Sequence, residues 1–564
     1  MPGDASARPW WQDGVVYQIY PRSFADSNDD GIGDLRGILQ HLDYLNDGKG
    51  GGLGIDAIWL SPINPSPMFD FGYDVSDYRG IAPEFGTLDD FRELLHEAHA
   101  RGIRIILDLV LNHSSHLHPW FLESRAARGS AKRDWYIWHD GQPGTPPKPP
   151  NNWQATFGGG AWEWDEATQQ FYLHTFLVEQ PDLNWRNPAV KQAAADIVGY
   201  WLDMGVDGFR LDVINWFVKD AALRDNPTKL LGRRAYDRQR HVHDRNRPET
   251  IDLVRWLRAS VDRYPERMLV GEVYNEPPGN AALAASYYAG GAGLHLAFDF
   301  SFLFARWSAS ELGRAIDAWQ GLLAEPCWPT YTFGNHDQRR LLSRYANGTN
   351  RVARGRVAAA LMLTLRGTPF LYYGEEIGMV DGKIRKSELQ DPLGKQYWPL
   401  LFGRDPARTP MQWSDAANAG FSSVKPWLPV QEEFAAINVA RAEADPDSLL
   451  HWYRHLIRVR RAEPALTRGS YRRLAQGSGV LGYVREHDGD RIVVLLNFES
   501  RARPAALPTG ATWRVLASSA HQPGDRLVGG TIELAADGVI VAKAGAPQAR
   551  TLGSESRVRA SVGR

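Results

Sequence analysis

The chain has 564 residues and a single cysteine, Cys327. One thiol excludes a disulfide within the chain, so folding does not require an oxidising compartment. A surplus of charge of one sign is also missing, because 64 Lys and Arg residues nearly balance 66 Asp and Glu residues, for a formal net charge of −2. Proteins that bind nucleic acid usually carry a basic surplus. We therefore expect no nucleic-acid partner.

Long apolar runs are absent as well. No uncharged stretch reaches the roughly 20 residues that a membrane-spanning helix needs, and the first residues lack the apolar segment of a secretory signal. We expect a cytoplasmic protein with no membrane partner, and the sequence leaves monomer and homodimer equally open.

The composition that remains is that of a globular protein, with 43 % apolar and 23 % charged residues. Tryptophan is unusually abundant, at 21 residues, as many as tyrosine or phenylalanine. Flat indole rings stack on sugars, but they also fill large cores. Composition alone leaves both interpretations open.

Short β-branched and aromatic runs alternate with amphipathic helical stretches, which is typical of βα units around a parallel sheet. We expect an α/β fold built on a (β/α)₈ TIM barrel. About 375 residues for eight units exceed the usual size of about 250, so the barrel must carry insertions. The eight predicted strands are Val15–Phe24, Ile55–Pro62, Arg104–His113, Val206–Ile214, Met268–Val273, Leu294–Phe300, Thr330–Asp337 and Pro369–Glu375.

Changes of pattern divide the chain into three predicted domains. The catalytic barrel takes residues 1–113 and 183–470, with an irregular excursion at 377–445. Residues 114–182, rich in Gly, Pro and Trp, form an inserted subdomain after the third strand. Residues 471–564 alternate apolar and polar positions between turns, which predicts a C-terminal antiparallel β-sandwich.

Ionisable residues gather where the predicted barrel strands end, which is where barrel enzymes hold their active sites. Arg210 and Asp212, two positions apart on one strand, point the same way. The guanidinium lowers the pKa of that carboxylate, as suits a nucleophile, whereas the apolar surroundings of Glu272 raise its pKa, as suits a general acid. Such a pair fits glycosidic cleavage. A single strand-end carboxylate is more often a helix cap, and a single histidine such as His113 more often a core residue, so the interpretation depends on convergence from several strands.

Four segments resemble, in order, the signature segments of the α-amylase family of glycoside hydrolases. They are Asp108–His113, Gly208–Asp212, Gly271–Val273 and Phe333–Asp337. Gln180–Asn184 is similar to a fifth segment as it occurs in the α-glucosidase and oligo-1,6-glucosidase branch. The stretches Trp11–Arg36 and Gly403–Trp413 also resemble that branch.

The resemblance implies a role for each matching position. Asp212 would be the nucleophile, Glu272 the acid/base and Asp337 the third carboxylate. Attack by Asp212 would give a covalent glycosyl-enzyme that water or a sugar hydroxyl resolves with retention. The implied substrate-binding residues are Arg210, His113 and His336 on sugar hydroxyls, Tyr73 stacked on the ring, Asp70 paired with Arg408 to close the pocket, and Phe157, Phe176 and Gln180 at its opening.

Side-chain oxygens recur at alternate positions in one loop after the first strand, at Asp26, Asn28, Asp30 and Asp34, with Ile32 at the remaining alternate position. This spacing resembles the first half of an EF-hand loop, but the twelfth position is Gly37 where an EF-hand has Glu. The family resemblance implies a structural Ca²⁺ (or Mg²⁺) site with Ile32 contributing its carbonyl. The alternative is an Asx-rich turn without metal. No cofactor is expected for catalysis.

The function that follows from the resemblance is a retaining, exo-acting α-glucosidase. It would release glucose from the non-reducing end of a small oligosaccharide or disaccharide, with transglucosylation. Val213, directly after the nucleophile, resembles the α-1,6-specific type, whereas Phe333–Asp337 and Asp225–Pro227 look closer to α-1,4-glucosidases. Linkage preference stays open.

Two alternatives also remain. One is a transglycosylase or a sucrose- or maltose-active isomerase on the same site. The other is a non-catalytic relative such as an amylase-like transporter ectodomain, which the three carboxylates and the absence of an apolar span disfavour. Four tryptophans are predicted to lie at the sugar pocket or its rim, namely Trp153, Trp162, Trp164 and Trp413.

Overall fold

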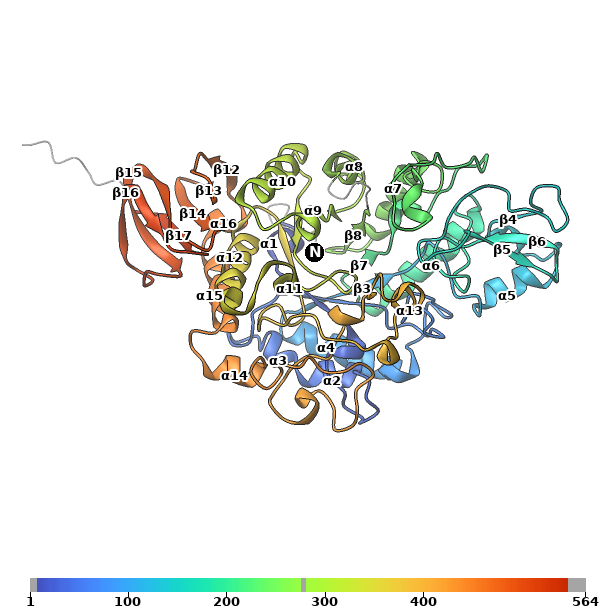
Figure 1. Ribbon diagram of the computed structural model, residues 1–564, viewed down its shortest axis with the longest axis horizontal. Coiled ribbons are helices and arrows are strands. Elements are labelled where there is room, and N and C mark those ends of the chain that lie inside the picture. Colours follow the sequence, from blue (N-terminus) through green and yellow to red (C-terminus); the bar gives the residue numbers. More distant parts are fainter. Residues whose placement is uncertain (1–7, 275–279, 546–564) are drawn as a thin grey trace, which may run out of the picture.

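The computed structural model describes residues 8–274 and 280–545, and its centre is a parallel sheet of eight strands (Figure 1). The hydrogen-bonded order is β10-β11-β1-β2-β3-β7-β8-β9. At the remaining seam, the Thr330 hydroxyl of β10 donates to the Ala297 carbonyl of β9 at 2.7 Å. The predicted TIM barrel is confirmed. Its strands are β1 Val16–Ile19, β2 Ala57–Leu60, β3 Arg104–Leu109, β7 Gly208–Leu211, β8 Met268–Glu272, β9 Leu296–Phe298, β10 Thr330–Thr332 and β11 Thr368–Tyr372.

Each strand is shorter than the predicted run, because pairing stops before the extended chain does. In β3 the ladder with β7 ends at Leu109, opposite Leu211. The chain then continues extended to His113, which forms an isolated bridge with Asp182 of the inserted region. The residues just past the ladder are therefore those that reach the mouth of the barrel.

Successive side chains of each barrel strand point to opposite faces of the sheet and so pack into two separate apolar cores. Trp59, Ile106, Val270 and Phe298 belong to a cluster inside the barrel. Their strand neighbours, such as Ile58 and Leu107, belong to the larger core against the helices.

Helices surround the sheet, and their ends carry the expected signals. Thr87 caps α4 in a capping box with Asp90, and Gly205 ends α6 in the left-handed conformation. The longer helices are α4 Leu88–Ala100, α6 Pro188–Met204, α7 Glu249–Val261, α10 Ala309–Leu322, α12 Arg351–Thr364 and α15 Leu449–Ala462. The shorter ones are α1 Trp10–Asp13, α2 Leu35–Gln40, α3 Leu42–Leu45, α8 Ala281–Ser286, α9 Ser301–Phe304, α11 Leu341–Tyr345 and α16 Pro464–Thr467.

The chain between β3 and α6 forms the expected insertion, which projects from the right of the barrel in Figure 1. It holds α5 Pro119–Ala126 and a small antiparallel sheet of β4 Trp138–His139, β6 Gln170–Leu173 and β5 Trp162–Asp165. The predicted excursion after β11 contains two short α-helices among its turns, α13 Pro392–Tyr397 and α14 Val439–Ala444.

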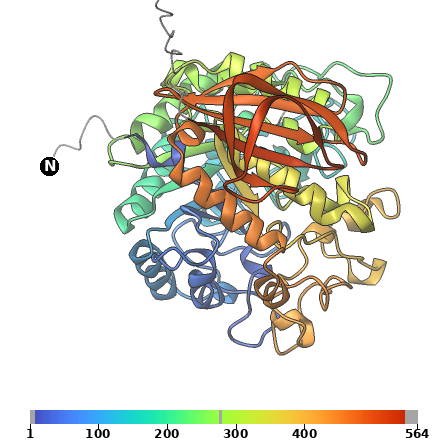
Figure 2. The ribbon, with the colours of Figure 1, turned by 90° about the vertical axis from the view of Figure 1, so that its left-hand side faces the viewer.

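The C-terminal region is an antiparallel sheet of six strands at the opposite side of the barrel, drawn in red in Figures 1 and 2. One face, including Tyr483 and Val494, joins the core of the barrel helices, and the other, including Val484 and Val493, forms a separate cluster with Trp513. The strands are β12 Ser470–Leu474, β13 Val480–His487, β14 Asp490–Asn497, β15 Arg503–Ser518, β16 Arg526–Leu534 and β17 Val539–Ala544.

The outer limits of the predicted domains, residues 1–7 and 546–564, lie outside the described residues. Among the helices that the structure describes, none is long and apolar enough to span a membrane.

Candidate active site

A cavity of about 250 Å³ opens at the carboxyl ends of the barrel strands. Asp212 follows β7, Glu272 ends β8, and Asp337 follows β10, and all three carboxylates line the cavity. The structure therefore brings together the residues that the sequence placed on separate strands. The other lining residues are Asp70, Tyr73, His113, Thr156, Phe157, Phe176, Val213, Trp216, Arg234, Tyr236, Asp237, Tyr274, Phe300, Leu303, Asn335, Gln338, Leu393 and Arg404.

Arg210 links the carboxylates below the cavity. It faces the barrel interior with a side chain that is 1 % exposed. Its Nη1 contacts Asp212 Oδ1 at 2.6 Å and Asp108 Oδ1 at 2.8 Å, and its Nη2 contacts Glu272 Oε2 at 2.5 Å. The sequence did not single out Asp108 as a site residue, although its place in the first signature segment was a signal. Because one guanidinium holds two of the lining carboxylates, they are close neighbours.

The electrostatics differ from the sequence-based expectation in one respect. Burial raises the pKa of Asp212 well above its usual value and also raises that of Glu272, while Arg210 opposes the shift at both. Arg210 therefore does not favour Asp212 over Glu272, because it bonds to each. Asp337 behaves differently: burial would raise its pKa, but His336, Arg404 and Arg408 together hold it below the usual range.

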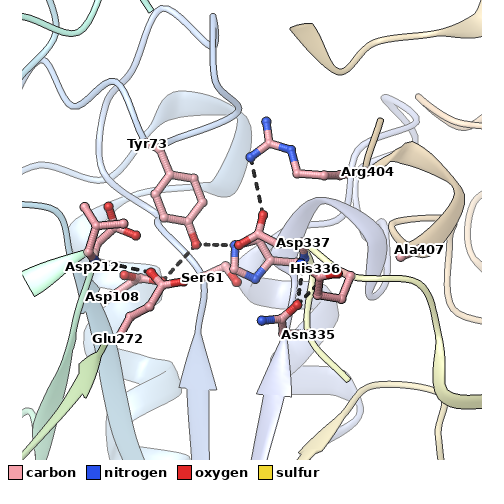
Figure 3. A network of polar contacts seen from close by, with 12 residues as sticks. Ser61, Tyr73, Asp108, Asp212, Glu272, Asn335, His336, Asp337, Arg404 and Ala407 are labelled. Carbon is pink, nitrogen blue, oxygen red and sulfur yellow. Dashed lines mark hydrogen bonds and ion pairs between the residues drawn. The ribbon is translucent and has the colours of Figure 1, made fainter. Parts of the chain in front are cut away.

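His336 and Tyr73 form a polar chain beside these carboxylates (Figure 3). His336 Nε2 lies 2.6 Å from Tyr73 Oη, which donates to Asp108 Oδ2 at 3.0 Å. Burial lowers the pKa of His336 well below its usual value, so it is a neutral ring at ordinary pH. Gln18 of β1, which the sequence did not indicate, contacts His336 Nδ1 at 2.8 Å.

Asp70 pairs with Arg404, and the predicted pairing with Arg408 is wrong. Arg404 Nη2 lies 2.6 Å from Asp70 Oδ1 and 2.6 Å from Asp391 Oδ1. Arg408, four residues later, turns beneath the site, where its Nε donates to the His336 carbonyl at 2.8 Å and its Nη2 to Asp337 Oδ1 at 3.0 Å. Both arginines lie in the same resembling segment, and spacing alone does not show which one reaches Asp70.

The predicted aromatic and amide residues lie around this ion pair. Phe157 and Phe176 line the cavity, with ring centroids 5.9 Å apart. His113 also lines it, and its Nε2 lies 3.0 Å from the Tyr73 carbonyl. Gln180 is fully buried and donates to Asp70 Oδ2 at 3.2 Å, so it lies behind the wall rather than at the opening.

Val213 has an unusual backbone. Its φ of 39° and ψ of 44° place a β-branched residue in the left-handed region, which is strained. This turn aims the Val213 N–H at Glu272 Oε2, 3.2 Å away. The conformation of the residue after the nucleophile is thus coupled to the predicted acid/base.

Several lining residues were not predicted, and the largest group of them comes from the irregular chain after β7, where no periodicity marks an inward face. They include Trp216, Arg234, Tyr236 and Asp237.

The four tryptophans predicted at the pocket do not line the cavity. Trp153 and Trp162 belong to the inserted region's own apolar cluster, against which Trp164 packs. Trp413 lies on His41, 3.7 Å between ring centroids.

The predicted metal loop is held by its own hydrogen bonds. Asp26 accepts from the backbone N–H groups of Asn28, Asp29 and Gly31 at 2.8–3.1 Å. Asp34 caps α2 and accepts from Gly37 N at 2.7 Å. The hard oxygen donors suit Ca²⁺ or Mg²⁺, but no set of three His, Cys, Asp or Glu side chains in residues 8–274 and 280–545 has a geometry that could hold a metal. The metal site stays a prediction.

Comparison with known proteins agrees with this geometry. The "Alpha amylase, catalytic domain" family matches residues 18–469. A probable alpha-glucosidase of Rhizobium meliloti is 44 % identical over 513 residues, which cover 89 % of this chain and 91 % of that protein. An oligo-1,6-glucosidase of Parageobacillus thermoglucosidasius is 38 % identical over 535 residues, covering 89 % and 92 %.

Among solved structures, the alpha-glucosyl transfer enzyme XgtA aligns with a TM-score of 0.89 at 41 % identity, covering 96 % of this chain and all of that one. Family, fold and the carboxylate-lined cavity agree: the chain belongs to the α-amylase family of glycoside hydrolases and is an α-glucosidase-like enzyme.

Proposed function

We propose that this enzyme is a retaining, exo-acting α-glucosidase that removes one glucose from the non-reducing end of a short α-glucoside. Asp212 attacks the anomeric carbon while Glu272 protonates the leaving oxygen, and water or another sugar hydroxyl then resolves the glycosyl-enzyme with Glu272 as base. Asp337, ionised because the guanidinium groups of Arg404 and Arg408 outweigh its burial, holds hydroxyls of the distorted ring.

The observation that carries the proposal is the shared guanidinium. Asp212 and Glu272 bind adjacent nitrogens of Arg210 at 2.6 and 2.5 Å. This arrangement supports the carboxyl separation of about 5–5.5 Å that retaining enzymes use, since inverting enzymes need about 6.5–9.5 Å to admit a water.

The exo mode rests on the Asp70–Arg404 ion pair. Both side chains are nearly buried, 5 % and 11 % exposed, and Arg404 also contacts Asp337 at 3.3 Å. A cavity bounded by this pair beside the sugar-binding carboxylate has room for a chain end and not for a chain that continues.

The proposal is tested by following isomaltose and maltose hydrolysis with proton NMR. The leaving glucose is released as the equilibrium mixture of its anomers, so the diagnostic quantity is the excess of one anomer over that mixture. We expect an early excess of α-glucose, which mutarotation then removes. An early excess of β-glucose would overturn the retaining mechanism. The ratio of the two initial rates tests the Val213 prediction, since a clear preference for isomaltose supports it and a preference for maltose contradicts it.

Transfer is a second activity that the relatives favour, because XgtA is named as an alpha-glucosyl transfer enzyme. Water and sugar hydroxyls compete for the same glycosyl-enzyme. Product analysis at rising disaccharide concentration is expected to show trisaccharides increasing relative to free glucose.

A further inference from the structure

The chain between β7 and α7 builds one part of the cavity wall. Trp216, Arg234, Tyr236 and Asp237 all line the cavity from this loop. A glucosyl unit bound among Asp70, Tyr73 and Asp337 fills the closed end, so the loop faces the second sugar, which leaves in hydrolysis and enters in transfer.

The outer edge of this loop is fixed to the inserted region. Arg234 Nη1 donates to the Thr156 carbonyl at 2.9 Å. Asn152 and Asn226 bond reciprocally, at 2.9 Å from Asn152 Nδ2 to the Asn226 carbonyl and 2.8 Å from Asn226 N to Asn152 Oδ1. These contacts fix the outer edge of the loop, but none of them involves Tyr236. The position of Tyr236 must therefore depend on the residues packed behind its ring.

Behind Tyr236 lies a buried histidine that the mechanism does not use. The His241 side chain has no exposed surface, and its Nδ1 lies 2.6 Å from Asp244 Oδ2. Its Nε2 lies 3.0 Å from the Tyr236 carbonyl. The imidazole also stacks on the Tyr236 ring, 4.0 Å between centroids at an interplanar angle of 28°.

The partners of His241 fix the orientation of its ring. Nδ1 lies against the Asp244 carboxylate and Nε2 against the Tyr236 carbonyl, so both ring nitrogens are engaged. Burial would raise the pKa of Asp244, but its contacts with His241, together with Arg245, hold it below its usual value. His241 and Asp244 therefore form a buried, hydrogen-bonded pair.

This pair belongs to a group of charged and polar side chains around the Tyr236 ring. Arg234 lies 5.5 Å from the Tyr236 ring centroid and pairs with Asp237 at 2.8 Å. Arg245 Nη1 contacts Tyr236 Oη at 3.4 Å. Cations near the face of an electron-rich ring attract it, so the cluster holds Tyr236 by its carbonyl, its ring face and its hydroxyl.

We propose that His241, oriented by its hydrogen bond with Asp244, is a positioning residue that holds Tyr236 as the wall for the leaving or accepting sugar. The inference rests on the proposed α-glucosidase function. It predicts that weakening the pair lowers kcat/KM for substrates with a second sugar and leaves kcat/KM nearly unchanged for substrates without one.

The test compares two substrates in the full-length enzyme. α-Glucosyl fluoride has no second sugar, whereas the disaccharide that the wild type prefers has one. For His241→Gln, we expect kcat/KM on the disaccharide to fall about tenfold, mainly through KM, with kcat/KM on the fluoride changed less than about twofold. An equal loss on both substrates, or no loss on either, would overturn the inference.

His99→Gln is the matched control, because His99 forms a similar pair with Asp207 (2.7 Å) at the opposite end of the barrel. We expect His99→Gln to leave kcat/KM unchanged on both substrates. If His241→Gln does not fold, Tyr236→Leu removes the wall directly and must give the same disaccharide-selective loss. A wild type inactive on both substrates would overturn the proposed function itself, and with it this inference.

Discussion

At the scale of single residues, one buried arginine organises the site. Arg210 binds Asp108, Asp212 and Glu272, so no carboxylate in this set is an independent group. Burial raises the pKa of both Asp212 and Glu272, and the pair titrates together. Asp337 differs from this pair. Burial would raise its pKa, but its neighbours His336, Arg404 and Arg408 lower it, so Asp337 is the carboxylate that stays ionised.

Replacing Glu272 tests the acid/base assignment. Glu272→Gln cannot protonate a leaving sugar, so kcat/KM on a disaccharide should fall by about 10²–10⁴-fold, while α-glucosyl fluoride, whose leaving group needs no proton, should still form the glycosyl-enzyme. A parallel loss on both substrates in the first step would contradict the assignment.

The pH dependence of the wild type follows from the same group. Glu272 acts as an acid only when protonated, and burial raises its pKa. Disaccharide hydrolysis should therefore persist above the ordinary range of a glutamate and fall as pH rises through the raised value. The fluoride reaction of the wild type, whose leaving group needs no proton, should lack this alkaline limb in its first step, measured as kcat/KM against pH.

At the scale of elements, the sequence patterns predicted the strands and helices that pack against the core. The eight strands and the capped helices could be found because their apolar residues repeat with the periods of strands and helices. Arg404 and Tyr236 could not, because loops without periodicity bring them to the cavity. The four tryptophans were misplaced for a related reason: composition shows that indoles are abundant and not which of them are buried.

The turn after β11 predicts a pH-dependent stability. Glu375 is buried, neither of its carboxyl oxygens has a hydrogen-bond partner among the residues that the structure describes, and burial raises its pKa to about 8. The folded state thus holds a proton that the unfolded state releases near its ordinary pKa of 4.5, so stability should decline as pH rises between these values. Glu375→Gln should remove part of this decline, seen as a smaller fall in Tm from pH 5 to pH 8 than in the wild type.

Glu432→Gln is the control, because Glu432 is exposed and paired with Lys383. Its Tm should follow that of the wild type at both pH values. An unchanged fall in Tm for Glu375→Gln would show that Glu375 is ionised in the folded protein.

The loop after β1 carries the metal prediction. If Ca²⁺ binds through Asp26, Asn28, Asp30, Asp34 and the Ile32 carbonyl, added Ca²⁺ should raise Tm, chelator should lower it, and Asp30→Ala should abolish both effects. A Tm that changes with neither Ca²⁺ nor Mg²⁺ would favour the Asx-rich turn, because hydrogen bonds within the loop already stabilise it.

At the scale of the whole molecule, the inserted region and the C-terminal sheet have separate tasks. The insertion borders the cavity through Thr156, Phe157 and Phe176. The C-terminal sheet packs on the far side of the barrel (Figure 1) and contributes no lining residue from the part of the chain that the structure describes. We therefore expect damage to the sheet to affect stability and leave substrate binding intact.

Arg485 is the most direct test of that expectation. It is fully buried and donates to the carbonyls of Thr364, Leu466, Gly469 and Ser470 at 2.6–3.1 Å. Arg485→Met would leave these carbonyls unsatisfied and should lower the free energy of unfolding by at least about 3 kcal/mol, with KM unchanged. The exposed Arg526→Met should change it by less than about 0.5 kcal/mol. A changed KM for Arg485→Met would contradict the separation of tasks.

Asp212 should form a covalent bond to glucose, whereas Glu272 and Asp337 should not. This assignment can be tested by incubating the enzyme with 5-fluoro-α-glucosyl fluoride, which slows release of the intermediate, and mapping the label by mass spectrometry of peptides. We expect one fluoroglucosyl group per chain, on Asp212. A label on another carboxylate, or inactivation without any label, would contradict it.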